Sequence, residues 1–430
     1  MINSSERGRL WWLLAASLGL LVFLGITNKW VSWHAAIYQY KSYDDVNYRL
    51  MAQAAPGLLH GRIIPEWHAE RFVAAWVVGV TAKLLSFSVV TSFRIWVILM
   101  ILGTCLVLAD LLVRMELSLQ AAIVCMAVFI LNAYALRPYL LAPGSIDDMV
   151  FVFAATVAVR GLVLRSPFSL LGGLLLATVA RQTALPPAAV AAVAVAIDPA
   201  WRRRLGRRQM PFAALTIGLP LVTYAVIRIV SHPFAGPPPT IDQMTLLGAS
   251  LSFGSLVQHF GRCINVLLSI GALLLAAWWL ARGTPARLRD RRSPIPRIPA
   301  AILACLAFAL AIIAQPAVMN PAWASYNENR LSVMGLIPLV AALGLVLAQI
   351  ERTRTRDLSV PAAAAMVGLL ALGSFHHITT VIGTANKNQT LVLEVLVAVA
   401  LLLILPRAFP PTPARRRALG PAAADTTRSS

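Results

Sequence analysis

Long apolar stretches recur along almost the whole chain, and short polar or basic segments separate them. A helix rises about 1.5 Å per residue, so about twenty apolar residues cross the hydrocarbon core of a bilayer. The candidate spans are residues 10–27, 93–113, 119–136, 149–164, 168–180, 185–197, 211–230, 263–280, 299–315, 331–350, 360–375 and 390–405. The pattern predicts an all-α polytopic membrane protein with about twelve transmembrane helices, within a range of 11 to 13.

Composition supports the membrane prediction and excludes nucleic acid as a partner. The chain is 59% hydrophobic and 13% charged, which is not the composition of an ordinary soluble domain. Its formal charge of +20 is carried by segments such as WRRRLGRR and ARLRDRRSPIPR, which alternate with apolar spans. Cytoplasmic loops have this pattern under the positive-inside rule. No aromatic-basic module accompanies the charge, and the four cysteines have no metal-ligand spacing.

The basic loops set the expected topology. Residues 1–9 form a cytoplasmic N-terminus, residues 10–405 a polytopic membrane domain, and residues 406–430 a disordered basic cytoplasmic tail. The outer loops are then residues 28–92, 137–148, 231–262 and 316–330. The alanine-, proline- and arginine-rich composition suggests a bacterium, so we expect the inner (plasma) membrane with the functional loops on the extracytoplasmic face.

Two segments leave the topology open. Residues 72–90 are apolar enough to cross, but a crossing there would invert every later basic loop, so an interfacial or re-entrant helix is favoured. Residues 168–197 form either one long helix or a hairpin that turns at residues 181–187 on the outer side. The hairpin is favoured because it keeps the flanking arginines on one side of the membrane.

The first outer loop carries an adjacent acid pair, Asp44 and Asp45, in SYDDVNYRLMAQ. An unpartnered carboxylate next to a low-dielectric phase is costly, and partial desolvation makes it a stronger base. Either aspartate can therefore act as a general base. The alternative is that Asp45 caps a helix over residues 46–54.

A second acid pair, Asp147 and Asp148, directly precedes the fourth span in RPYLLAPGSIDDM. In the expected topology both pairs lie on the same face, as a composite catalytic site requires. Acids at a helix start also favour its dipole, and Ser145 or Asp147 makes a good cap. Both interpretations stay open.

The cations of these loops are candidates for a phosphate site. Arg71 heads the expected interfacial helix after His68 and Glu70, and can hold a phosphate bidentately or pair with neighbouring acids or headgroups. His68 and Glu70 alone are too few for a metal site. Arg137, Arg181 and Arg330 project from outer ends of spans, where they bind a phosphate leaving group or serve as snorkelling anchors.

Aromatic and amide residues complete the candidate set. The tryptophans and first-loop tyrosines are typical of an interfacial belt, but Tyr43 and Trp67 lie close enough to the acids to stack on a sugar. Asn327, Glu328 and Asn329 precede Arg330 and are weaker candidates for sugar binding.

The arrangement resembles the GT-C superfamily of integral membrane glycosyltransferases, which use polyprenyl-phosphate sugar donors. The features that carry the resemblance are one N-terminal span, the loop with SYDDVNYRLMAQ, the helix ERFVAAWVVGVTAKLLS, a two-span hairpin ending in RPYLLAPGSIDDMVFVF, and LGGLLLATVARQTALPP. It covers the N-terminal part of the chain up to that last segment. The absence of a long soluble C-terminal stretch departs from several members.

The resemblance implies roles for some of these residues. Asp44 or Asp45 would be the catalytic base, Asp147 or Asp148 would assist it, and Arg181 would contact the carrier phosphate. The acceptor would be an extracytoplasmic glycan, lipid or protein, and the sugar would be transferred with inversion. No cofactor is expected, although a divalent metal is left open. The alternatives are a transporter or flippase for lipid-linked substrates and a non-catalytic membrane assembly subunit.

Overall fold

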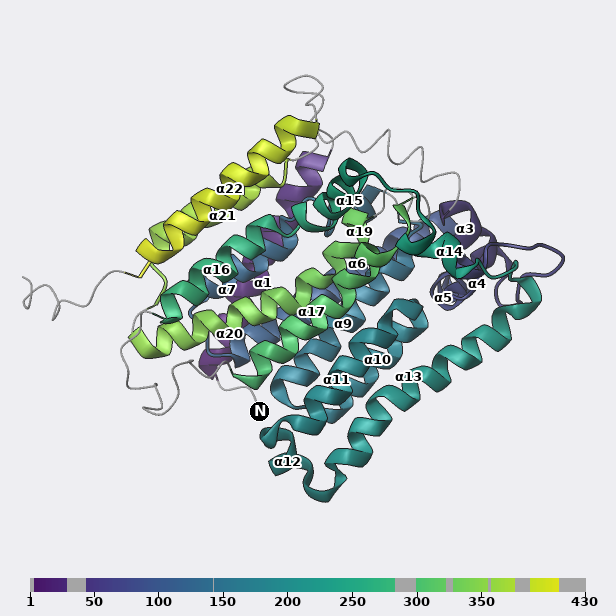
Figure 1. Ribbon diagram of the computed structural model, residues 1–430, viewed down its shortest axis with the longest axis horizontal. Coiled ribbons are helices and arrows are strands. Elements are labelled where there is room, and N and C mark those ends of the chain that lie inside the picture. The colour runs from purple at the N-terminus through teal and green to yellow at the C-terminus, as the bar shows by residue number, and fades with distance from the viewer. Residues whose placement is uncertain are drawn as a thin grey trace, which may run out of the picture.

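The computed structural model describes residues 4–28, 44–141, 143–282, 299–321, 328–354, 357–375 and 387–409. It is all-helical, with 84% of it in helices and no strand among these residues (Figure 1). In chain order the first helices are α1 (Ser4–Thr27), α3 (Asp44–Ala54), α4 (Glu66–Ala69), α5 (Phe72–Leu84), α6 (Val89–Arg114), α7 (Leu119–Ile130), α8 (Arg137–Leu141), α9 (Ile146–Leu164), α10 (Pro167–Ala180) and α11 (Leu185–Ile197). They are followed by α12 (Pro199–Leu205), α13 (Gln209–Ser231), α14 (Ile241–Met244), α15 (Phe253–Asn265), α16 (Leu268–Arg282), α17 (Ala300–Val318), α19 (Glu328–Ser332), α20 (Leu336–Arg354), α21 (Val360–Gly373) and α22 (Lys387–Arg407).

Helices of membrane-crossing length are present. Among the described residues, five helical runs are long and apolar enough to cross a membrane, and a sixth is added if α15 and α16 form one bent crossing. The five runs are Ser4–Thr27, Val89–Arg114, Pro199–Phe234, Ala300–Val318 and Glu328–Arg354. The prediction of an all-α chain with apolar spans is therefore confirmed, whereas the count of about twelve spans stays a prediction.

The ambiguous segment after Phe72 forms a short helix. α5 has thirteen residues, and thirteen residues rise only about 20 Å against a hydrocarbon core of about 30 Å. Ser86 then takes a left-handed conformation with φ of 56°, and α6 starts after Ser88, whose hydroxyl accepts from the Thr91 amide at 3.0 Å. The chain doubles back, because the Ser92 hydroxyl donates to the Val78 carbonyl at 2.9 Å. α5 is thus too short to cross by itself.

The second ambiguous segment is not one continuous helix. α10 ends at Ala180, Arg181 is extended with φ of −155°, and a 3-10 turn over Gln182–Ala184 leads into α11. The favoured two-helix interpretation of residues 168–197 is therefore the observed one. A contact between the residues that flank the two helices supports this arrangement. Arg165, which follows α9, lies beside Asp198, which follows α11, with Nη2 3.3 Å from Oδ2.

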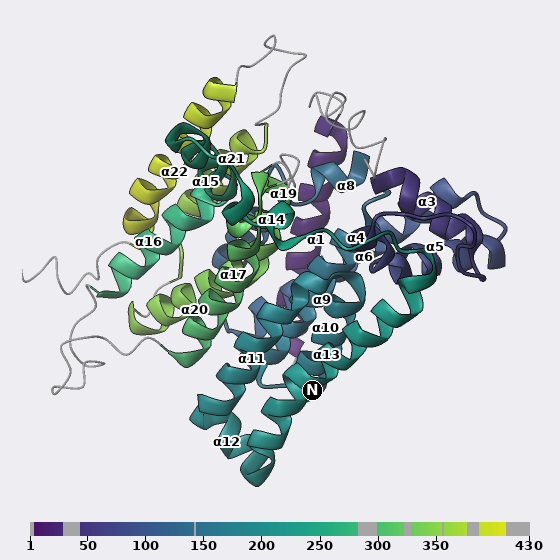
Figure 2. The ribbon, with the colours of Figure 1, turned by 45° about the vertical axis from the view of Figure 1, so that its right-hand side comes forward.

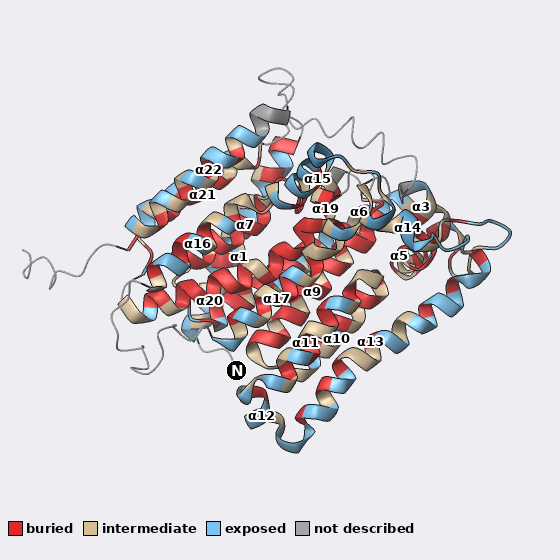
Figure 3. Cartoon of the chain, in the orientation of Figure 1, coloured by how far each residue is buried: buried red, intermediate tan, exposed pale blue. Residues whose placement is uncertain are grey.

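α9 is the central helix of the bundle, and α10 packs tightly against it. Most of α9 is buried, and only the side with Val150, Phe153 and Val157 is partly exposed, as expected of a helix largely enclosed by others. Figure 3 shows α9 and α20 largely buried, and α12, α13 and α22 more exposed. A Cβ at Gly173 of α10 would lie 2.4 Å from the Ala158 amide nitrogen, so only glycine allows this approach. Close packing places the start of α9 beside the end of α10.

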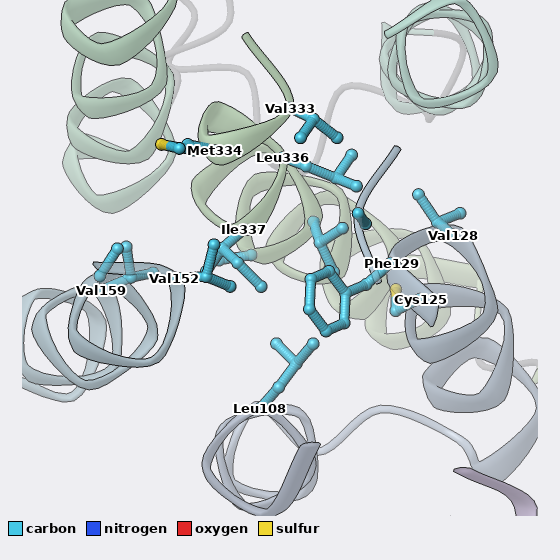
Figure 4. Close-up of a cluster of buried hydrophobic side chains, with 14 of the residues drawn as sticks. Leu108, Cys125, Val128, Phe129, Val152, Val159, Val333, Met334, Leu336 and Ile337 are labelled. Atoms are coloured by element: carbon cyan, nitrogen blue, oxygen red, sulfur yellow. The ribbon is translucent and has the colours of Figure 1, made fainter. Parts of the chain in front are cut away.

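The core lies where α6, α7 and α9 meet the start of α20. Figure 4 shows Leu108, Phe129, Val152 and Leu336 pointing into this cluster, and all four are buried. Apolar side chains fill it, including the sulfur-containing Cys125 and Met334, so this layer holds the helices together.

The two ends of the bundle differ in their charged groups. At one end, the lower side of Figure 1, lies α12, whose arginines are exposed. Near the C-terminal ends of α6 and α9, Asp110 pairs with Arg160 (Oδ2 to Nε, 2.7 Å). We call this the basic end. Helices α3 to α5, α8, α14, α15 and α19 gather at the opposite end in Figures 1 and 2. Figure 2 also shows α3 to α5 on one side of the bundle and α16, α21 and α22 on the other.

Candidate functional site

Asp147 and Asp148 open α9 at the end opposite the basic end, and neither is exposed to solvent. Asp148 Oδ2 accepts from the Tyr139 hydroxyl at 3.1 Å and lies 2.6 Å from Arg330 Nε. Its Oδ1 contacts Arg181 Nη1. Both oxygens of Asp148 therefore lie beside a guanidinium group, and only Oδ2 accepts a hydrogen bond from the described residues.

Asp147 has longer contacts than its neighbour. Its Oδ2 accepts from the Tyr48 hydroxyl at 3.1 Å and lies 3.6 Å from both Arg71 Nη1 and Arg181 Nη1. Its Oδ1 has no hydrogen-bond partner among the described residues. The N-cap of α9 is Ser145, which makes no side-chain capping bond. Ser145 therefore stands at the N-cap position without a capping bond, and the Asp147 carboxylate bonds to another element instead of capping. Both aspartates lie in the first turn of α9, where the helix dipole favours negative charge, as the alternative interpretation expects.

Three arginines from three segments surround this acid pair. Arg71 precedes α5 and also donates through Nε to Gln182 Oε1 at 3.2 Å. Arg181 follows α10, and Arg330 belongs to α19. We call Asp147, Asp148, Arg71, Arg181 and Arg330 the charge cluster. The carboxylates stand at the N-terminus of α9 and Arg181 stands at the C-terminus of α10, so both helix dipoles favour the pairing.

The cluster is electrically unusual because it is buried. Side-chain exposure is 0% for both aspartates, 3% for Arg181, 10% for Arg330 and 11% for Arg71. Burial, with the neighbouring Arg71 charge, lowers the pKa of Arg181 to about 10, so its guanidinium still stays charged at neutral pH. Among the described side chains three guanidinium groups face two carboxylates. A cluster of this kind can accept an anion.

His68 and Trp67 line the same region through α4. The buried His68 ring contacts Tyr48 edge-on, with centroids 5.4 Å apart, and its Nδ1 lies 3.3 Å from Asn47 Nδ2. Trp67 packs against His68 at 5.5 Å. Because Tyr48 donates to Asp147, these aromatic rings border the charge cluster. Within the described ranges no group of three or more histidine, cysteine, aspartate or glutamate side chains could hold a metal ion.

For the first-loop acids Asp44 and Asp45, the structure describes only the backbone. Asp44 and Asp45 form the first turn of α3. The capping alternative expected the helix to begin after Asp45, whereas Asp45 lies inside it. Their side chains, and all of Tyr43, lie outside the described residues. Asp44 precedes Tyr48 by one helical turn, and residues four apart share a helix face. The role of either residue as a base stays a prediction.

Helices α3 and α5 are pressed together, which fixes this part of the site. A Cβ at Gly79 of α5 would lie 1.9 Å from the Ala52 carbonyl oxygen of α3, so the two backbones are in direct contact. α3 thereby holds Tyr48, which is fully buried, against Asp147.

Arg137 bonds to residues outside the charge cluster. Its guanidinium donates to the Thr27 hydroxyl at 2.9 Å, to the Ser374 hydroxyl at 3.0 Å and to Asn28 Oδ1 at 3.2 Å. It also lies over the Phe375 ring, 5.6 Å from the centroid. These contacts tie α8 to the ends of α1 and α21. Of the predicted cations, Arg71, Arg181 and Arg330 come together and Arg137 does not join them.

Other residues of the site were not predicted as such. Tyr48 and Tyr139 each donate to one aspartate, although tyrosines in these loops are expected at the membrane interface. The spacing of Asp44 and Tyr48 in DDVNY is the signal that could have placed Tyr48 on the acid-bearing face. Tyr224 donates to both oxygens of Glu70 at 3.1 and 3.2 Å, and the nearby Arg71 charge also acts on this carboxylate. Burial raises the pKa of Glu70, and Arg228 Nε lies 3.6 Å from it.

No known protein-family model matches the chain, and no curated protein matches it significantly. What the site can do is therefore inferred from its own geometry and from the sequence motifs that the helices carry.

Proposed function

We propose that this protein is a membrane glycosyltransferase of the GT-C type, which moves a sugar from a polyprenyl-phosphate carrier to an extracytoplasmic glycan, lipid or protein. The observation that carries the proposal is the charge cluster, in which a buried acid pair meets arginines from three segments. Burying five ionised groups opposes folding unless they are well paired, and such groups at a membrane commonly mark a functional site.

The charge of the cluster suits the donor. A polyprenyl-phosphate sugar is a phosphodiester with one negative charge, and guanidinium groups bind phosphate oxygens through paired hydrogen bonds. When the bond between sugar and phosphate breaks, the departing phosphate gains a second charge. Arginines already aimed into a dry site stabilise that charge in the transition state without reorganising.

The two aspartates of α9 differ in what they can do. Asp148 has a guanidinium group beside each oxygen, Arg181 at Oδ1 and Arg330 at Oδ2, so we assign it the role of positioning these two arginines. Asp147 keeps Oδ1 without a partner among the described residues. That oxygen can accept a hydrogen bond from a hydroxyl of the sugar or the acceptor, which is the assisting role that the resemblance implies for this loop.

The base is assigned to Asp44 or Asp45 by the resemblance, and the geometry supports it through the backbone. α3 carries both residues and holds Tyr48 against Asp147. The base removes a proton from the acceptor hydroxyl while that oxygen attacks the anomeric carbon, and the bond from that carbon to the phosphate oxygen breaks on the opposite face. The product has inverted configuration, and polyprenyl phosphate leaves.

The test is to incubate purified protein in lipid nanodiscs with a panel of polyprenyl-phosphate sugars and to measure release of the carrier phosphate. Asp44→Asn or Asp45→Asn should lower release by about a hundred- to ten-thousand-fold at one position, since asparagine cannot accept the proton. Asp242→Asn, an exposed change in α14, is the matched control and should retain the rate.

Two results would contradict the proposal. Full activity in both first-loop single variants and in their double variant would exclude a base in this loop. Donor binding and transbilayer movement without any carrier release would instead identify a transporter of lipid-linked substrates.

A further inference from the structure

Helix α15 has the reverse of the usual amphipathic arrangement. Its exposed face carries Phe253, Val257, Phe260 and Ile264, with 84%, 55%, 40% and 54% of each residue exposed. Its buried positions are His259 and Cys263. These four apolar residues recur at helical spacing and form one continuous stripe. An apolar stripe of this length facing water would be unfavourable, so it indicates a nonaqueous neighbour.

The direction of α15 points to the membrane boundary. α15 and α16 meet at an angle of 68°, and the apolar α16 continues directly from it. If α16 runs along the bilayer normal, α15 lies closer to the membrane plane than to the normal. α16 also exposes Leu275 and Trp279, and together the two helices are apolar enough to form one bent crossing. Lipid that surrounds α16 would therefore lie next to α15, which favours lipid over a second protein as the neighbour of the stripe.

The inward face of α15 contacts α19, the helix that carries Arg330. His259 Nδ1 lies 3.1 Å from Glu328 Oε1, and His259 Nε2 lies 3.2 Å from the Ala317 carbonyl oxygen at the end of α17. Arg262 Nη1 is 3.7 Å from the same Glu328 oxygen. Glu328 is fully buried in α19, two residues before Arg330. A buried polar contact of this kind holds its helix in one position.

We infer that α15 is an interfacial helix whose apolar stripe lies in lipid, and that its inward face clamps α19 so that membrane contact holds Arg330 in the charge cluster. The chain of contacts runs from lipid to the stripe, from His259 to Glu328, and from Arg330 to Asp148. The inference concerns lipid contact and helix position, and it holds or fails independently of the reaction proposed above. His259 and Glu328 are positioning residues in this arrangement.

The lipid contact is tested by a spin label at Val257→Cys in liposomes. The four native cysteines among the described residues are buried, so they can stay in place. We expect the label at residue 257 to collide with oxygen, which concentrates in lipid, and to be shielded from a water-soluble nickel complex. Asp242→Cys on the exposed α14 is the control and should show the opposite preference. Equal nickel access at both sites, or shielding from both reagents by a second copy of the chain, would overturn the inference.

The clamp is tested by amide hydrogen exchange over residues 328–335 in nanodiscs. Glu328→Gln should raise exchange there by about tenfold, because one buried charge-assisted contact is lost. The exposed double change Val257→Ser and Phe260→Ser should raise it in the same segment, although it leaves His259 and Glu328 intact. Arg262→Gln is a milder substitution if Glu328→Gln does not fold.

Exchange in α11, which has no part in the clamp, is the internal control. Unchanged exchange at residues 328–335 in the double variant Val257→Ser and Phe260→Ser would show that lipid contact of the stripe does not affect the position of α19. That result would overturn the proposed coupling. Unchanged exchange in both Glu328→Gln and Arg262→Gln would show that α15 does not hold α19.

Discussion

The two ends of α9 carry the same kinds of charged residue in opposite physical settings. At the basic end Asp110 accepts from Arg160 at 2.7 Å and Arg114 at 2.9 Å, with side-chain exposures of 16%, 24% and 37%. In the charge cluster both aspartates are fully buried, and Asp147 keeps one oxygen without a described partner. Water and salt weaken the first set, whereas low dielectric makes the second set costly to form and costly to break.

The comparison suggests what each end is for. Partly exposed arginine pairs at helix ends contribute little to stability and mainly fix topology. Buried charged groups at a membrane are rare and commonly mark a functional site. Residue type alone does not separate the two cases, because both ends contain aspartate, arginine and serine.

The largest expected effect is on labelling, because the two ends should lie on opposite sides of the membrane. A cysteine at the exposed Asp242 should react with a membrane-impermeant maleimide in intact cells, whereas a cysteine at the exposed Arg207 should react only after the cells are opened. The difference should be close to all or none. Labelling of both residues in intact cells would show that the charge cluster and the basic end are not separated by the bilayer.

A second prediction compares the two acids at opposite ends. Asp148→Asn should lower stability by about 3 to 5 kcal/mol, since it leaves Arg181 and Arg330 buried without their carboxylate. Asp110→Asn should cost about 1 kcal/mol or less, because solvent reaches its partners. Thermal unfolding in nanodiscs measures both. Equal losses in the two variants would mean that burial does not set the energetics of these pairs.

A third prediction concerns arginine geometry. Arg181→Lys should weaken binding of a polyprenyl-phosphate sugar by about tenfold or more, because a lysine ammonium cannot reproduce the planar fork of a guanidinium. Arg114→Lys at the basic end should bind like wild type, since an exposed anchor tolerates either cation. Isothermal titration with the donor checks this. Wild-type affinity in Arg181→Lys, Arg71→Lys and Arg330→Lys alike would place the phosphate site elsewhere.

The sequence predicted the features that are set within a single helix, such as its limits and the polar residues at its ends. The span pattern located α10 and α11 within a residue of their observed limits, and the arginine loops separated the two ends. The convergence of Asp147, Asp148 and Arg181 followed from polar residues at the ends of adjacent apolar helices.

The rest depends on contacts between distant segments, which residue type does not reveal. Arg137 looks like Arg181 in sequence, yet neighbouring hydroxyls from α1 and α21 hold it. His259 and Glu328 are 69 residues apart, and neither local segment indicates the other. The short length of α5 was also hidden, because the apolar run continues through the turn at Ser86 into α6.

The smallest effect is expected at the most exposed pair of the basic end. Arg352 Nη2 lies 3.0 Å from Glu116 Oε2, with side-chain exposures of 62% and 69%. Glu116→Gln should change stability by about 0.5 kcal/mol or less, because water screens the attraction and two long side chains lose rotamer freedom to form it. Adding salt to wild type should produce a similarly small loss, since the pair is within reach of mobile ions. Unfolding midpoints at low and high salt measure both effects. A loss as large as that of Asp148→Asn would show that distance, rather than burial, governs ion pairs throughout this protein.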